Sequence, residues 1–224
     1  MRGKKMSNVL YIEGFIGEVY DFWTDELKNT SNRGIVKNLE NVSGDIELHI
    51  NSKGGDAFEG LAILGTLKNY DKGYKTAIVD GFCASSATLP LFAMDNVKAH
   101  PTAMFCFHKS GTMAYGHAND LRKSADDLDR IDGVITDLYM NKFTGTQEEL
   151  DAILDEDRLM TAQEAFDLGF IDEIIQDEPE EPEDKSDEQI GLSFLDGFTL
   201  AKEHVQEEHD KLENSFLNKF KKIE

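Results

Sequence analysis

The sequence predicts an α/β fold in which short buried strands alternate with helices. Two observations support this class. Short apolar or alternating segments, typical of strands with a buried face, recur along residues 1–175. Three of them, at 9–12, 46–50 and 77–79, are followed by a turn and then by a predicted helix, a pattern that favours parallel strands linked by helices.

The individual elements follow from the same patterns. We expect strands at 9–12, 46–50, 77–79, 97–99, 104–107 and 170–175. A turn at 14–17 is expected to lead into a helix through 18–23. Further helices are expected at 32–41, 58–67, 88–94 and 118–143, and two short ones begin with capping boxes at Thr146 and Thr161.

The composition argues against a nucleic-acid-binding, membrane-spanning or secreted protein. The net charge of −21 argues against nucleic acid as a partner. Apolar runs stay well short of the roughly 20 residues that span a membrane, and the basic start has no apolar stretch typical of a signal peptide. Cys83 and Cys106 both lie in apolar strand-like segments, where reduced core cysteines of a cytoplasmic protein are expected.

The stretch 81–87, Gly-Phe-Cys-Ala-Ser-Ser-Ala, connects a buried strand to an apolar helix. A serine at such a junction lies where the unpaired N–H groups of a helix start gather, so it is placed to act as a nucleophile beside an oxyanion hole. The alternative is that Ser85 or Ser86 only caps the helix.

A second small-residue turn contains Gly54 and Gly55, between a strand and a helix, where backbone N–H groups are exposed. A plain tight turn is the alternative, and the glycine spacing does not fit a phosphate-binding loop. His108 ends a predicted strand and opens a glycine-containing loop, where it is placed to meet a serine, although a structural histidine fits as well.

A carboxylate suited to a serine triad occurs between the two capped helices. Asp157 precedes Arg158 in a loop, which is also typical of a surface ion pair of little energetic consequence. A buried or oriented carboxylate could instead hold the imidazole of His108 in the catalytic tautomer.

Together these motifs resemble the proteolytic subunit of the Clp protease, ClpP, and the ClpP/crotonase fold. The resemblance covers about residues 9–175. The matching pieces occur in order at 50–55, 60–63, 81–85, 108, 116–120, 157–165 and 169–172.

The resemblance implies a role for each site residue. Ser85 becomes the nucleophile, His108 the general base and Asp157 the carboxylate that orients it. The backbone N–H groups of Gly55 and Ser86 become the oxyanion hole. No metal and no cofactor are implied. Asp155 and Glu156 are close enough in sequence to replace Asp157 in a shifted register.

The resemblance also implies a repeated β-β-α superhelix with a long protruding handle helix. Family members form two stacked heptameric rings, so we expect a homo-oligomer whose inner chamber admits unfolded polypeptides. Only eight residues precede Val9, whereas family members carry a pore-lining segment there that helps engage an AAA+ ATPase. Such an ATPase partner is therefore left open.

Three segments are expected along the chain: a ClpP-like peptidase domain at 1–175, an acidic disordered linker at 176–190 and an amphipathic helical extension at 191–224. A tail of this kind resembles the ClpP-like peptidases of phage and prophage head maturation. The extension is then expected to dock on capsid or scaffold protein, the alternative being a disordered tail with scattered apolar residues.

The leading hypothesis is a self-compartmentalised, cytoplasmic serine endopeptidase. The main alternative is a catalytically silent, ring-forming scaffold or assembly protein with the same fold. A crotonase-type acyl-CoA enzyme needs no Ser-His pair, and a Ser-Lys peptidase of the signal-peptide-peptidase kind usually has a membrane anchor that the sequence does not show.

Overall fold

A computed structural model describes residues 8–17, 20–21, 26–27 and 30–176. The acidic linker and the C-terminal helix that the sequence predicts lie outside the described residues, apart from Gln176. In the part of the chain that the structure describes, no helix combines the length and the apolar character needed to cross a membrane.

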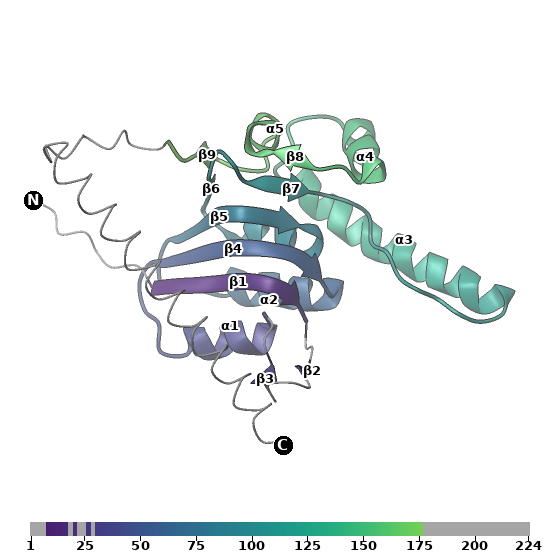
Figure 1. Cartoon of the computed structure of the whole chain (residues 1–224), viewed down its shortest axis with the longest axis horizontal. Coiled ribbons are helices and arrows are strands. Elements are labelled where there is room, and N and C mark those ends of the chain that lie inside the picture. Colours follow the sequence, from purple (N-terminus) through teal and green to yellow (C-terminus); the bar gives the residue numbers. More distant parts are fainter. Residues whose placement is uncertain (1–7, 18–19, 22–25, 28–29, 177–224) are drawn as a thin grey trace, which may run out of the picture. The chain divides into compact units, whose positions relative to one another are not determined.

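The described residues form a mixed α/β structure built on a mainly parallel sheet (Figure 1). Its main path runs β1-β4-β5-β6-β9, and each neighbouring pair on that path is parallel. The strands of this path are β1 (Asn8–Ile16), β4 (Ile46–Gly55), β5 (Lys75–Ala84), β6 (Asn96–Ala99) and β9 (Glu173–Ile174). These elements confirm the predicted α/β class.

A short branch extends the sheet beside the C-terminal end of β5. There β7 (Met104–Cys106) pairs in parallel with β5, and β8 (Met160–Thr161) pairs antiparallel with β7. This branch brings the segment around residue 160 next to the end of β5, although the two are far apart in sequence.

Helices connect the strands. They are α1 (Asn32–Leu39), α2 (Ala57–Lys68), the 3₁₀ helix η1 (Ser85–Ala93), α3 (Ala118–Met140), α4 (Gln147–Glu156) and α5 (Ala162–Asp167). Side chains begin several of them: Asp56 caps α2, and capping boxes at Thr146 and Thr161 begin α4 and α5 as the sequence predicts.

The long helix α3 is buried only near its C-terminal end. Its buried residues are Ile135, Leu138 and Tyr139, whereas Leu121 is 45% exposed. Figure 1 shows the other end of α3 extending beyond the sheet. The aromatic rings of Phe107 and Phe170 stack at 4.0 Å and meet Tyr139, which ties the end of α3 to the segment after β7.

Three sequence expectations near the two ends of the described chain are wrong in detail. The predicted turn at 14–17 is mostly strand, because β1 continues to Ile16 through a register shift at Gly14 and Phe15. The predicted helix at 18–23 is wrong at Tyr20–Asp21, which form β2 and pair antiparallel with β3 (Glu26–Leu27). The predicted strand at 170–175 is ordered as a strand only in β9.

The predicted helix at 88–94 begins earlier and is of the 3₁₀ type. Pro90 lies inside η1 and has no N–H to donate, so it cannot take its place in an α-helical hydrogen-bond ladder. The helix begins at Ser85, directly after β5, without the intervening turn that the sequence suggests.

Candidate active site

The candidate site lies where three neighbouring parallel strands end. β4 ends at Gly55, β5 ends at Ala84 before Ser85, and β7 ends at Cys106 two residues before His108. β4 pairs with β5, and β5 pairs with β7, so these ends lie at one edge of the sheet. Ligands of open parallel sheets bind at this edge.

Ser85 has a left-handed backbone. Its φ of 56° is one of two positive φ values among the described non-glycine residues. Such a conformation costs about 1–3 kcal/mol and persists only where the surrounding structure enforces it. The residue that caps η1 is Ala84, which makes no side-chain cap, so Ser85 does not have the capping role that was its alternative.

Gly54 leaves room for the turn at Ser85. A Cβ atom at Gly54 would lie 2.6 Å from the carbonyl oxygen of Ala84, 2.7 Å from Cβ of Ser85 and 2.9 Å from the amide nitrogen of Ser86. Its φ of +85° also favours glycine. The missing side chain therefore keeps the N–H of Ser86 uncovered, as an oxyanion hole requires.

Gly55 lies against β1. A side chain there would meet the ring of Phe15 at 2.8 Å and the amide nitrogen of Ile16 at 2.9 Å, and its φ is +156°. Both glycines thus belong to the end of β4, and the plain turn considered from the sequence is not what they form.

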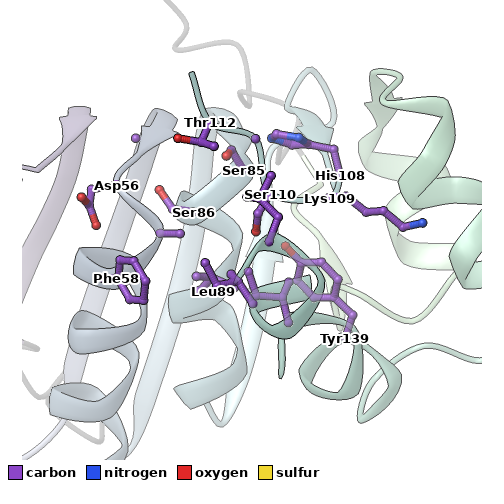
Figure 2. A pocket seen from close by; sticks show the side chains of 16 residues that line it. Asp56, Phe58, Ser85, Ser86, Leu89, His108, Lys109, Ser110, Thr112 and Tyr139 are labelled. Carbon is purple, nitrogen blue, oxygen red and sulfur yellow. The ribbon is translucent and has the colours of Figure 1, made fainter. Parts of the chain in front are cut away.

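His108 lies between the serine and a carboxylate. Figure 2 shows its imidazole pointing toward Ser85, and both residues line one pocket. Its Nδ1 lies 3.8 Å from Oδ1 of Asp157, a distance too long for a hydrogen bond. Catalytic hydrogen bonds are often this loose before substrate binds.

Asp157 also has a left-handed backbone, with φ of 47° at the C-cap of α4. Its side chain is 67% exposed. The neighbouring carboxylates have other partners, since Asp155 pairs with Lys109 at 2.6 Å and Glu156 pairs with Arg158 at 2.8 Å. Asp157 is therefore the candidate that faces His108.

Cys106 donates a hydrogen bond to the same carboxylate oxygen. The distance from its Sγ to Oδ1 of Asp157 is 3.4 Å. Burial, together with this hydrogen bond, raises the pKa of Cys106 to about 11, so the thiol keeps its proton at neutral pH. Cys83 and Cys106 are both buried and free, as the sequence predicts.

Two residues that the sequence analysis does not single out brace the serine turn. The hydroxyl of Thr88 donates to the carbonyl oxygen of Ser85 at 2.7 Å. Because that hydroxyl has one proton, the hydroxyl of Tyr139 donates to Thr88, also at 2.7 Å. Tyr139 is 1% exposed, and burial raises its pKa. The end of α3 thus holds the start of η1.

The pocket has a volume of about 350 Å³. Ser85, His108 and Gly55 line it, and Figure 2 shows Leu89 and Tyr139 on the side away from Ser85 and His108. Apolar residues of α3 complete the wall, namely Leu128, Ile131 and Ile135. Within the described residues, no group of three or more His, Cys, Asp and Glu side chains is arranged to hold a metal ion.

The family model for Clp protease matches residues 13–178, which is most of the chain. The chain belongs to the Clp protease family. This membership implies a serine-type peptidase, and members of the family generally form homo-oligomeric rings. The resemblance inferred from the ordered motifs is thereby confirmed at the level of the family.

The residues that the sequence predicts for the site are brought together here. Ser85, Ser86, Gly55 and His108 line one pocket, and Asp157 faces His108 from outside it. Thr88, Tyr139 and Ser110 are the contributors that sequence reasoning missed. In the sequence Tyr139 is one of the apolar residues at helical spacing along α3. Its hydroxyl is the only sign in the sequence that this position has a polar partner.

Proposed function

We propose that the protein is a self-compartmentalised serine endopeptidase that cleaves unfolded polypeptides. The observation that carries the proposal is the shared pocket at the ends of β4, β5 and β7. It combines a serine at positive φ, a histidine that points toward it, and two backbone segments whose N–H groups can serve an oxyanion.

In this proposal Oγ of Ser85 attacks the carbonyl carbon of the scissile bond while His108 accepts its proton. The N–H groups of Gly55 and Ser86 stabilise the oxyanion, and one such donor typically contributes about 3–4 kcal/mol to transition-state stabilisation. His108 then protonates the leaving amine. It next takes a proton from water, whose oxygen attacks the carbonyl carbon of the acyl-enzyme, and it returns that proton to Oγ of Ser85 as the carboxylic acid leaves.

Asp157 accepts a hydrogen bond from Nδ1–H of His108 in the active arrangement, which fixes the tautomer of the imidazole. The separation of 3.8 Å must close by about an ångström for this bond to form. Because the carboxylate of Asp157 is exposed in the single subunit, assembly of the ring is the step that we expect to close it.

The proposed ring is heptameric and stacks in pairs through the exposed part of α3, the handle helix. Substrates then reach the pocket only as unfolded chains. The acidic C-terminal extension, which lies outside the described residues, supports a role in phage head maturation with capsid or scaffold protein as substrate. An AAA+ ATPase partner stays an open part of the proposal.

Degradation of an unfolded protein tests this function. Assembled protein is incubated with casein and, separately, with a tightly folded protein, and the products are identified by mass spectrometry. We expect peptides from casein alone, and none with the Ser85→Ala variant. Equal cleavage by Ser85→Ala would contradict the proposal, and an assembled ring that cleaves nothing would favour the silent scaffold.

A further inference from the structure

Two buried hydroxyl groups in the pocket have no hydrogen-bond partner. Among the residues that the structure describes, the buried side-chain oxygen atoms without a partner are Oγ of Ser86 and Oγ of Ser110. Both residues line the pocket beside Ser85, and Ser86 is 4% exposed. Buried hydroxyls are nearly always paired in folded proteins, so these two are available to hydrogen-bond a polar group that enters the pocket.

Both serines are held in place by the fold. Ser86 is the second residue of η1 and directly follows the serine at the turn. Ser110 follows His108 in the loop before α3, and its backbone N–H donates to Oδ1 of Asp132 on α3 at 2.6 Å. In the view of Figure 2, Ser86 and Ser110 lie on either side of the space between Ser85 and Leu89.

The other residues that line the pocket limit which substrate side chains the two hydroxyls can bind. Leu89, Ile131 and Ile135 form the apolar part of the pocket, and Asp56 and Thr112 also line it. Lys109 also lines the pocket, but its ammonium group is paired with Asp155 at 2.6 Å. A buried substrate carboxylate would therefore lack a free cation, whereas an apolar side chain would leave both hydroxyls unpaired.

We propose that Ser86 and Ser110 make the protein prefer substrates with a carboxamide side chain, glutamine or asparagine, on the N-terminal side of the cleaved bond. The inference rests on the proposed peptidase function and adds its substrate preference. A carboxamide oxygen accepts from one hydroxyl, and its NH₂ group donates to the other. The pocket volume of about 350 Å³ is sufficient for a glutamine side chain.

The test compares peptide substrates that are identical except for glutamine, methionine or glutamate before the cleaved bond. Methionine has nearly the length of glutamine but no comparable hydrogen-bonding end. A site that hydrogen-bonds its substrate discriminates strongly against an analogue without the bonding group. With the assembled wild-type protein we expect kcat/KM for glutamine to exceed that for methionine by about tenfold or more, and glutamate to be the poorest of the three.

Variants assign the preference to the two serines. Ser110→Ala and Ser86→Ala are each expected to reduce the ratio of kcat/KM for glutamine over methionine by several fold, and the double variant is expected to abolish it. Ser124→Ala is the matched control, because Ser124 lies on α3 outside the pocket and its hydroxyl donates to the carbonyl of Asp120. Its ratio should equal that of the wild type.

The outcomes separate this inference from the function beneath it. If a fluorophosphonate labels Ser85 and the peptides are cleaved, but methionine is preferred over glutamine, the selectivity inference is wrong and the peptidase proposal stands. An unchanged ratio in the double variant would also overturn it. If neither labelling nor cleavage occurs in the assembled wild type, both the selectivity inference and the peptidase proposal are wrong. If a variant fails to fold, the ratio of kcat/KM for glutamine over methionine in the wild type alone tests the selectivity inference.

Discussion

Ser85, the proposed nucleophile, has a strained backbone. Its positive φ occurs at the end of β5, where Ser85 lines the pocket, and Gly54 makes that conformation possible by having no side chain. The strain is local, but it is balanced by contacts from β4, η1 and α3. Substitutions at the neighbours of Ser85 are therefore expected to matter as much as substitutions at Ser85 itself.

Gly54→Ala is expected to lower kcat by about 100-fold, because the added methyl group would collide with Ser85 and cover the N–H of Ser86. Peptide hydrolysis by the assembled variant measures the effect.

Gly65→Ala is the matched control. Gly65 lies inside α2 with nothing within 4 Å of an added Cβ, so that variant should keep full activity and gain about 0.5–1 kcal/mol in free energy of unfolding. Similar activities in the two variants would contradict the role of Gly54.

Asp157→Asn is expected to lower kcat by about 10⁴-fold while leaving the fold intact, because the neutral amide cannot stabilise a positively charged imidazole and its NH₂ group can donate to Nδ1 of His108, which favours the wrong tautomer. Asp155→Asn should change kcat by less than about threefold, since Asp155 loses only an exposed ion pair with Lys109. Steady-state hydrolysis by the two variants at equal assembly decides the assignment. A larger loss for Asp155→Asn would show that the triad uses the shifted register.

At the scale of an element, η1 is fastened to α3 by a pair of buried hydroxyls. Thr88→Val removes the acceptor of the Tyr139 hydroxyl and the donor to Ser85, at nearly constant side-chain volume. We expect a loss of about 1–3 kcal/mol in free energy of unfolding. Thr88→Ser keeps the hydroxyl and should lose clearly less. Urea unfolding at matched protein concentration compares the two, and equal losses would mean that the methyl group matters and the hydroxyl does not.

The sheet carries a titrating group of its own. His49 of β4 contacts Asp80 at 2.9 Å and Glu47 at 3.2 Å. Burial by itself lowers the pKa of His49, but its interactions with Asp80 and Glu47 outweigh burial and raise the pKa above 6.5. The folded state thus binds the proton more tightly than the unfolded state. The stability that this proton contributes to the folded state is fully present below the ordinary histidine pKa. It is lost as the pH rises through the raised pKa of His49 in the folded state.

We therefore expect the free energy of unfolding to be lower at pH 8 than at pH 6. In the His49→Asn variant most of this pH dependence should disappear. Urea unfolding midpoints at the two pH values measure the difference, and an NMR titration of the imidazole gives the pKa directly. If His49 titrates below 6.5, the account of this cluster is wrong.

The elements that the sequence predicts are those with a local apolar pattern, such as the strand at 46–50 and the long helix, observed at Ala118–Met140. The continuation of β5 to Ala84 depends on pairing with β7, and β2 depends on β3, so no local pattern indicates them. The site is similar. Motif order points to Ser85 and His108, whereas the contact between Thr88 and Tyr139 spans 51 positions of sequence and leaves no short-range signal.

At the scale of the whole molecule, the described chain brings the residues of the proposed triad near one another without joining them. His108 Nδ1 and Asp157 Oδ1 are 3.8 Å apart, and Cys106 occupies the oxygen that faces the imidazole. Clp protease family members generally form rings. The account therefore predicts that activity belongs to the assembled protein and that subunits outside a ring are weak or silent.

Labelling with a fluorophosphonate tests whether the reactivity of Ser85 depends on assembly of the ring. The protein is separated by size, and each fraction of the wild type and of Ser85→Ala is treated with the reagent. We predict that label appears in the ring-sized fraction of the wild type, is much weaker in smaller species and is absent from Ser85→Ala. A properly assembled wild-type ring that takes no label, or a Ser85→Ala ring that takes as much, would contradict the account.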